Sequence, residues 1–203
     1  MMEAQNGYRR TWLEAANDLV GSTQIFASTI DALIQGRLAE GGDPLLTLGQ
    51  LKLLQIVDLV EAPTLSDVAR LLDVSPAAAS KAVDRLVGRN LLHRNPAEMD
   101  RRALHLSLTD EGKCLLEEYA ELKKGMFSEL FEGRPKSELR QIADFLDRLS
   151  VQLIAWSNDP PEKCMRCGIY FRRKCVLRER FPHACPYHAS WRRANSSEVD
   201  GPM

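Results

Sequence analysis

The sequence predicts a mainly α-helical protein with one small β-hairpin. Two observations support this fold class. Apolar residues recur at helical spacing over most of the chain, and only the stretch 91–108 reads as two short strands around a polar loop. A third observation is that residues 158–193 are rich in cysteine and arginine. This segment has too few apolar residues to form a hydrophobic core of its own. We therefore expect long helices around a helix-turn-helix with a hairpin, followed by a small cross-linked tail.

The composition limits the class of protein but does not name a partner. The 203 residues suit one domain with an appendage or two small domains, and 44% hydrophobic residues describe a soluble globular protein. The formal net charge of −1 gives no overall preference for acidic or basic partners. No apolar run approaches the roughly 18 residues that a membrane span needs, and the first residues lack the layout of a signal peptide.

Two helix starts lie close together in the middle of the chain. Thr64 and Asp67 form a shortened capping box, and Ser75 followed by Pro76 is a second start signal. Asn90 can adopt the left-handed conformation that ends a helix. Apolar residues repeat at helical spacing after both starts: Val68, Ala69, Leu71 and Leu72, then Ala79, Ala82, Val83, Leu86 and Val87. Two helices joined by so short a turn form a helix-turn-helix.

A charged hairpin follows the second helix. We predict a strand over 91–94, a polar loop over 95–102 and a second strand over 103–108, with Leu104, Leu106 and Leu108 on one face. A helix-turn-helix followed by such a hairpin is a winged helix.

The winged-helix stretch resembles a known family. Asp100-Arg101-Arg102, Leu106-Ser107-Leu108-Thr109 and Gly112 are similar to the wing signature of the MarR family of bacterial transcription regulators, over about residues 47–122. Asn90 departs from the glycine that is usual in the family. The resemblance implies a dimeric, sequence-specific DNA-binding repressor in the cytoplasm, and not an enzyme. No nucleophile–base pairing or glycine-rich phosphate loop argues for catalysis either.

The residues expected to contact DNA lie on the second helix and the wing. A recognition helix exposes small and polar side chains at its N-terminal end, and wing arginines can enter the minor groove. The expected contacts are Ser75, Pro76, Ala77, Ser80, Lys81, Arg85, Arg94, Arg101 and Arg102. The competing interpretation is an ordinary solvated surface, but these basic groups lie on the two elements that a winged helix offers to duplex DNA.

The flanking helices predict a symmetric homodimer. Stripes of apolar residues run over 11–38, 109–131 and 137–156, and another helix with a capping box covers 47–60. In the family, the outer helices form the dimer interface. Two recognition helices would then lie roughly 34 Å apart and read a pseudo-palindromic operator.

This organisation divides the chain into five segments. They are an N-terminal dimerisation helix and loop (1–44), the winged helix-turn-helix (45–112), C-terminal dimerisation helices (113–157), a cysteine-rich metal-binding segment (158–193) and a disordered tail (194–203).

Four cysteines in the tail have the spacing of a metal site. Cys164, Cys167, Cys175 and Cys185 follow the pattern C-x2-C-x7-C-x9-C, with His183 and His188 as alternative ligands. So short a segment cannot build its own core, and a metal is a natural staple. Residues 164–193 hold eight Lys/Arg and one acidic residue, which would compensate thiolate charge.

The identity of the metal stays open at this point. Only the first cysteine pair forms a close knuckle, and an iron–sulfur cluster tolerates the spread arrangement better than structural zinc does. We therefore prefer a [4Fe–4S] cluster, with Zn²⁺ as the alternative and free or disulfide-switching thiols as a third possibility. This tail is not part of the common MarR pattern, so the resemblance carries nothing over to it.

The tail suggests how DNA binding could be regulated. Loss or oxidation of the cluster could unfold the segment and change the spacing of the recognition helices, which would make it a sensor of redox or cluster status. Alternatively, zinc holds the tail permanently and a small molecule between dimer helices and winged helix is the signal. Tyr8, Trp12 and Phe26 could line such a pocket, although aromatic residues on helices are more often core. An electron-transfer protein on a winged-helix scaffold is a third alternative.

Two further residues have simple expectations. Cys114 should pack as a small buried group beside Leu115 and Leu116. His105 should be a surface residue on the strand face opposite the leucines.

Overall fold

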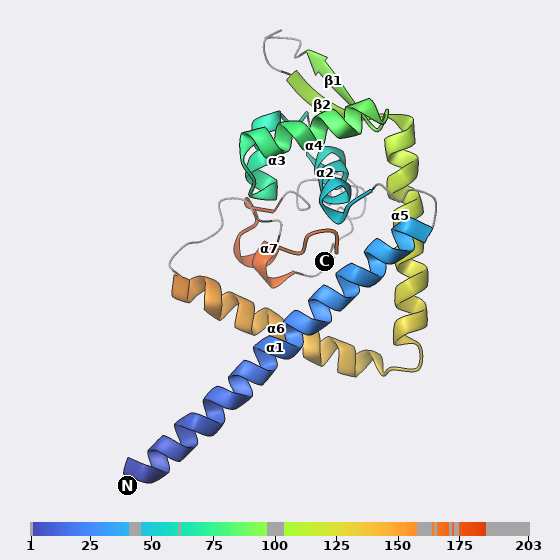
Figure 1. The fold of residues 1–203 in the computed structure, drawn as a ribbon. Coiled ribbons are helices and arrows are strands. Elements are labelled where there is room, and N and C mark those ends of the chain that lie inside the picture. The colour runs from blue at the N-terminus through green and yellow to red at the C-terminus, as the bar shows by residue number, and fades with distance from the viewer. Residues whose placement is uncertain are drawn as a thin grey trace, which may run out of the picture. The chain divides into compact units, whose positions relative to one another are not determined.

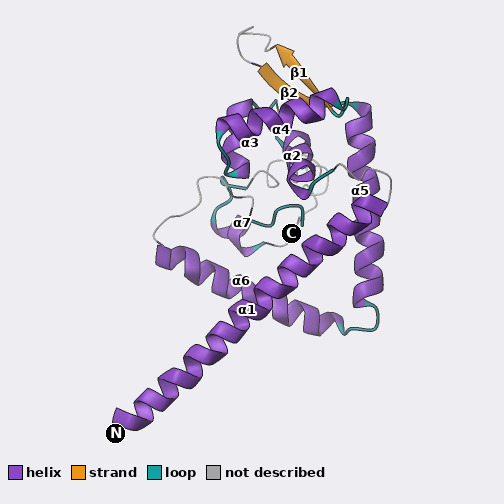
Figure 2. Ribbon diagram, in the orientation of Figure 1, coloured by secondary structure: helices purple, strands orange, loops and turns teal. Residues whose placement is uncertain are grey.

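Helices dominate the structure, as the sequence predicts. A computed structural model describes residues 2–40, 46–60, 62–96, 104–157, 164, 166–170, 172 and 175–185, with side chains from residue 11 onward except residue 39. These residues form helices and one two-stranded antiparallel sheet (Figures 1 and 2). The chain divides into two units, residues 1–48 and 49–203, which are described separately.

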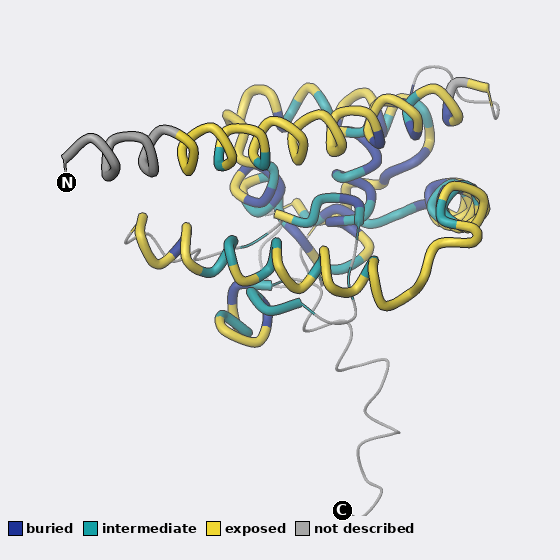
Figure 3. The backbone as a smooth tube through the Cα atoms, turned by 90° about the horizontal axis from the view of Figure 1, so that it is seen from below, coloured by how far each residue is buried: buried dark blue, intermediate teal, exposed yellow. Residues whose placement is uncertain are grey.

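The first unit is one long helix and the chain that follows it. Helix α1 spans Met2–Glu40 and is longer than the predicted 11–38. Gln35 joins its end to the following chain, because its Nε2 donates to the Leu46 carbonyl at 2.8 Å and its Oε1 accepts from the Leu48 amide at 3.0 Å. Figure 3 shows most of α1 exposed. Large apolar side chains contribute to this exposed surface: Trp12, Leu13, Val20, Ile25, Phe26 and Leu33.

The second unit is built around a winged helix. It contains α2 (Leu48–Leu59), α3 (Leu65–Leu72), α4 (Pro76–Gly88), β1 (Leu92–Pro96) and β2 (Leu104–Leu108). The core of this unit is aliphatic, and its completely buried side chains are Leu51, Leu53, Leu54, Ile56, Val68, Val83 and Leu86. The capping box at Thr64 is confirmed, since its side chain accepts from the Asp67 amide and Asp67 accepts from the Thr64 amide.

The hairpin differs from the prediction at its tip. The strands pair in register from Leu92↔Leu108 to Pro96↔Leu104, so β1 includes Asn95 and Pro96, which were expected in the loop. Leu106 is buried, but Leu104 is 48% exposed, because the hairpin tip extends past the helices in Figure 1. The inner end of β2 is held by the Leu106 amide, which donates to the Pro63 carbonyl at 2.9 Å.

Three further helices complete the described part of the second unit. They are α5 (Asp110–Phe131), α6 (Lys136–Ser157) and the short α7 (Val176–Arg180). Cys114 on α5 is exposed, so its predicted burial is wrong. The Cys114 side chain lies on the solvent-exposed side of α5, where its thiol is 3.6 Å from Glu118 Oε1. No helix among the described residues is long and apolar enough to span a membrane.

A tight joint connects the end of the α4 segment to the start of α5. Asn90 has a φ of 56°, the left-handed conformation that its sequence position predicts. Thr109 caps α5 by accepting from the Gly112 amide at 2.9 Å, and its hydroxyl donates to the Asn90 carbonyl at 2.7 Å. The Thr109 amide also donates to the Leu91 carbonyl at 3.2 Å. We call these contacts of Asn90, Leu91, Thr109 and Gly112 the α4–α5 joint.

Gly112 allows the close approach in this joint, which gives a stability prediction. A methyl group at Gly112 would overlap the backbone carbonyl oxygen of Leu91, whereas Gly125 on the same helix has open space around it. Gly112→Ala is therefore expected to destabilise the chain by about 1–3 kcal/mol through overpacking. Gly125→Ala should stabilise it by about 0.5–1 kcal/mol, because alanine favours the helix. Chemical denaturation measures both, and equal effects would contradict the joint.

Candidate nucleic-acid interface

The N-terminal end of α4 is built by local capping. Asp73 takes a left-handed φ of 55° and ends α3, and Ser75 then begins α4 from an extended conformation. The Ser75 hydroxyl accepts a hydrogen bond from the Ala78 amide at 3.2 Å, and Pro76 occupies the first helical turn. This capping fixes the direction in which α4 leaves the turn.

The predicted recognition face of α4 is open to solvent. Ser75, Pro76, Ala77, Lys81 and Arg85 are exposed, and Ser80 is partly buried. The opposite face is formed by Ala79, Val83 and Leu86, which are buried against the core. Small side chains at the start of the helix and two cations further along can thus approach a surface without disturbing the fold.

Arg94 on the wing pairs with a residue of α4. Its Nη2 lies 2.7 Å from Asp84 Oδ1, with 33% of the Arg94 side chain and 55% of the Asp84 side chain exposed. The pair connects β1 to the same helix that carries Lys81 and Arg85. This pair could not be predicted from the sequence pattern, because its partners come from a helix and a strand. Arg101 and Arg102 lie outside the described residues.

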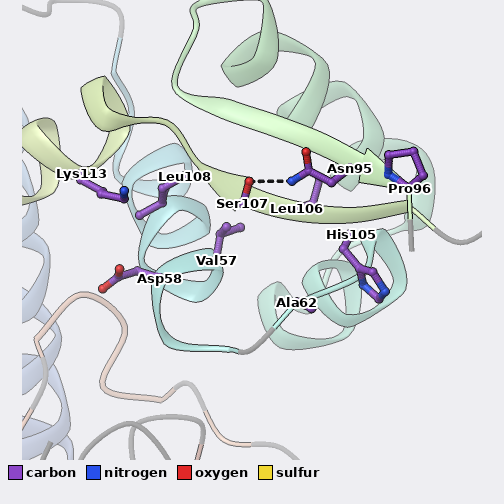
Figure 4. A pocket seen from close by; sticks show the side chains of 10 residues that line it. All are labelled: Val57, Asp58, Ala62, Asn95, Pro96, His105, Leu106, Ser107, Leu108 and Lys113. Carbon is purple, nitrogen blue, oxygen red and sulfur yellow. Dashed lines mark hydrogen bonds between the residues drawn. The ribbon is translucent and has the colours of Figure 1, made fainter. Parts of the chain in front are cut away.

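A cavity of about 490 Å³ lies beneath the wing, between α2, the hairpin and the start of α5 (Figure 4). Asn95 Nδ2 donates to Ser107 Oγ at 2.8 Å on its wall. Asp58 and Lys113 lie on the α2 and α5 sides, and burial raises the pKa of Asp58 while the charge of Lys113 lowers it. The cavity therefore offers a mixed polar and apolar lining.

His105 belongs to this cavity, which corrects the expectation of a surface residue. Its side chain is partly buried, and its Nδ1 is buried without a hydrogen-bond partner among the described atoms. Here β2 forms an antiparallel bridge with Thr64, so the chain leading into α3 lies beside His105 at the edge of the strand.

The four tail cysteines come together in the second unit. Cys164, Cys167, Cys175 and Cys185 are all half-buried free thiols. Burial, together with charges on Cys175, Cys185 and Cys164, raises the pKa of Cys167 to about 11. The thiols are therefore close enough to interact electrostatically, although the described Cys, His, Asp and Glu side chains include no group of three arranged to hold a metal ion.

The alternative histidine ligands are less well placed or not described. His183 is exposed, and His188 lies outside the described residues. The donor chemistry thus fits a thiolate-bound metal or cluster, with the four thiols in one neighbourhood but not at coordinating positions.

Backbone hydrogen bonds hold the cysteine segment together. The Cys164 amide donates to the Ala184 carbonyl at 2.8 Å, which brings the first and last cysteines of the segment near each other. The Tyr170 amide donates to the Cys167 carbonyl at 2.9 Å, and Gly168 has a left-handed φ of 56° in this turn. The expected tight turn after the first cysteine pair is therefore present.

The cysteine segment packs on α5 and α6, which the sequence pattern did not reveal. Lys123 on α5 donates to the Ile169 carbonyl at 3.1 Å, and Phe127 stacks on Tyr170 with ring centroids 6.3 Å apart. Arg172 makes a bidentate pair with Asp147 on α6, at 2.5 and 2.9 Å.

Comparison with known proteins assigns the family. The MarR family model matches residues 46–104, which contain α2, α3, α4 and β1 and end at the first residue of β2. The winged-helix region of this chain, residues 46–104, belongs to the MarR family. The match leaves out the cysteine segment, so this segment is an addition to the MarR-type winged helix.

Individual relatives support the same assignment of the winged-helix region. It is 27% identical to the HTH-type transcriptional repressor MdtR of Bacillus subtilis over 139 residues, covering 68% of this chain and 90% of MdtR. It resembles the crystal structure of YusO from Bacillus subtilis (28% identity, TM-score 0.52, 66% of this chain and 96% of YusO). The fold also matches Streptococcus pneumoniae FabT in complex with DNA (20% identity, TM-score 0.60, 70% and 98%).

The Asp84–Arg94 pair leads to a prediction about DNA affinity. Asp84→Asn should raise affinity for a random-sequence DNA duplex at low salt, because it removes a carboxylate that repels phosphate and releases Arg94. Stability should change by less than about 1 kcal/mol, since the pair is solvent-exposed. Fluorescence anisotropy measures the binding.

Glu121→Gln is the matched control, since Glu121 forms an exposed pair with Lys124 on α5. It should leave DNA affinity unchanged. Unaltered affinity in Asp84→Asn would show that this pair lies away from the DNA.

Proposed function

We propose that this MarR family chain is a sequence-specific DNA-binding transcriptional repressor that acts as a homodimer. The observation that carries the proposal is the open face of α4, where Ser75, Pro76 and Ala77 precede the exposed cations Lys81 and Arg85. Small residues let a helix enter the major groove, and the cations can reach phosphate or guanine. The similarity to MdtR, a transcriptional repressor, and to FabT, whose crystal structure is a complex with DNA, supports this proposal.

The wing would add minor-groove contacts. Arg94 is exposed at the α4 side of the hairpin, and Arg101 and Arg102 are proposed to extend the contact at the tip. An arginine inserted beside the recognition helix senses groove width as well as charge. Residues Ser75, Pro76, Ala77, Ser80, Lys81 and Arg85 would then read the major groove.

Exposed apolar side chains support the dimer. On α1 they include Trp12, Val20 and Phe26, and on α6 they include Ile142, Phe145, Leu153 and Trp156. A stripe of this kind on a single chain is costly to leave in water. A second copy of the chain would cover it with C2 symmetry, and the operator would be pseudo-palindromic.

DNA binding by α4 predicts a change in salt dependence. Lys81→Ala should weaken binding to both random and selected duplexes, and it should reduce the slope of log K against log salt by roughly 0.9, the value for one lost phosphate contact. Lys124→Ala is the control, because Lys124 is an exposed lysine on α5, and it should retain both affinity and slope. If the two variants have the same DNA affinity and the same salt dependence, α4 does not contact the DNA.

We further propose that Cys164, Cys167, Cys175 and Cys185 bind a [4Fe–4S] cluster, with Zn²⁺ as the alternative metal. The support is the shared neighbourhood of the four half-buried thiols and the excess of basic residues around them. A bound metal or cluster would supply the cross-link that so small a segment needs. An iron–sulfur cluster would also make the segment sensitive to redox conditions or to cluster supply.

Metal analysis tests this part. The chain purified without oxygen should be brown and absorb near roughly 400 nm if it holds a cluster. Cys167→Ser should lose the metal, whereas Cys114→Ser should keep it, because Cys114 lies exposed on α5 outside the tail. A colourless wild-type chain with one zinc would establish the alternative, and a metal-free chain would exclude both.

The cavity beneath the wing supports a second candidate for the signal. A small molecule bound among Asp58, His105 and Lys113 would contact both the wing and the start of α5. In that case zinc would hold the cysteine segment permanently, and the small molecule would control DNA binding. Operator binding with and without the metal separates the two possibilities.

A further inference from the structure

The stretch from Cys167 to Arg172 touches two helices within six residues. At its first half, the Ile169 carbonyl accepts from Lys123 Nζ at 3.1 Å and Tyr170 stacks on Phe127, both on α5. At its end, Arg172 holds Asp147 on α6 through two hydrogen bonds. A short, turn-containing segment thus links the middle of α5 to the middle of α6.

The two helices meet at one turn and then separate. Gly133, with a left-handed φ of 75°, lies between the end of α5 and the start of α6. Figure 1 shows the helices leaving this turn in different directions, with α7 beside α6. The angle between them therefore depends on contacts made far from the turn, and the 167–172 stretch supplies such contacts on both arms.

The contacts lie directly beside the cysteines. Lys123 is half-buried and its pKa is lowered by burial, while negative charge on Cys167 acts in the opposite direction. Arg172 interacts most strongly with Asp147 and also electrostatically with Cys175. Each of the two cations that dock the stretch is thus near a different cysteine.

The far end of α5 is connected to the DNA-binding unit. The α4–α5 joint holds the first turn of α5 against Asn90 and Leu91 through the hydrogen bonds of Thr109. Gly112 lets the helix approach this backbone directly. A change in the direction of α5 would therefore be passed to the end of the α4 segment and the first strand of the wing.

We propose that residues 167–172 brace α5 against α6, so that the chemical state of the four cysteines sets the position of α5 relative to α6. Lys123 and Phe127 are the positioning residues on α5, and Asp147 is the positioning residue on α6. This inference rests on the proposed function only in assuming that the cysteines change state. The brace itself is a property of the chain without DNA.

Hydrogen–deuterium exchange of the full-length chain without DNA tests the brace. Asp147→Asn should increase amide exchange in α6 around residues 142–151 and in the 166–172 stretch, because it removes the charged partner of Arg172. Glu138→Gln, an exposed acid on the same helix, should leave exchange unchanged. Wild-type exchange in Asp147→Asn would overturn the brace.

A cysteine variant tests the coupling to α5. Cys167→Ser should increase exchange across residues 119–131 of α5, and Cys114→Ser should not. In the double variant Cys167→Ser/Asp147→Asn, exchange in α5 should be no higher than in the more affected single variant, because both changes release the same bracing segment, one near its α5 contacts and the other at its α6 contact. Additive effects would show that the cysteines and Asp147 act separately and would overturn the coupling.

A charge exchange keeps the test independent of local unfolding. Arg172→Asp and Asp147→Arg should each release the segment, and the double variant should restore wild-type exchange if the pair itself holds it. Failure to restore would overturn the role of the pair. A failure of DNA binding by α4 would leave these exchange results unchanged, so the brace and the proposed repressor function fail independently.

Discussion

The α4–α5 joint is the constraint on which the rest of the second unit depends. The Thr109 hydroxyl binds the Gly112 amide of α5 and the Asn90 carbonyl, its amide donates to the Leu91 carbonyl, and Gly112 leaves no side chain to separate the two segments. Because the joint combines a helix cap with hydrogen bonds to the chain after α4 at close approach, a displacement of α5 would be passed to that chain.

The elements of the winged helix could be predicted from sequence because their signals are local. Thr64 with Asp67, Ser75 with Pro76, and Thr109 at the start of α5 each act within one turn of helix, and all three caps are present. Asn90 likewise has the left-handed backbone expected at the end of a helix. The exposed character of Lys81 and Arg85 followed from the periodicity of Ala79, Val83 and Leu86 on the opposite face.

The contacts that decide the surroundings of a residue were not predictable. Cys114 was expected inside because its neighbours are leucines, yet one step along a helix turns a side chain by about 100°, and Cys114 is exposed. His105 was expected outside from strand alternation alone, but the bridge brings Thr64 beside it and the residue is partly buried. The Arg172–Asp147 pair joins residues 25 positions apart, and neither periodicity nor motif spacing carries such information. The spacing of the tail cysteines likewise indicates candidate donors and carries no information on their arrangement in space.

The apolar surface along α1 has a consequence for how the protein behaves at low abundance. Trp12, Val20, Ile25 and Phe26 are exposed in the single chain, so in the proposed homodimer the second copy that covers them would bind the folded form and not the unfolded one. Folding and association then share one equilibrium, and the resistance of the chain to heat increases with its own concentration. When a cell lowers the copy number of such a protein, the number of dimers falls more steeply than the number of chains. The reason is that dilution also dissociates the dimers that remain.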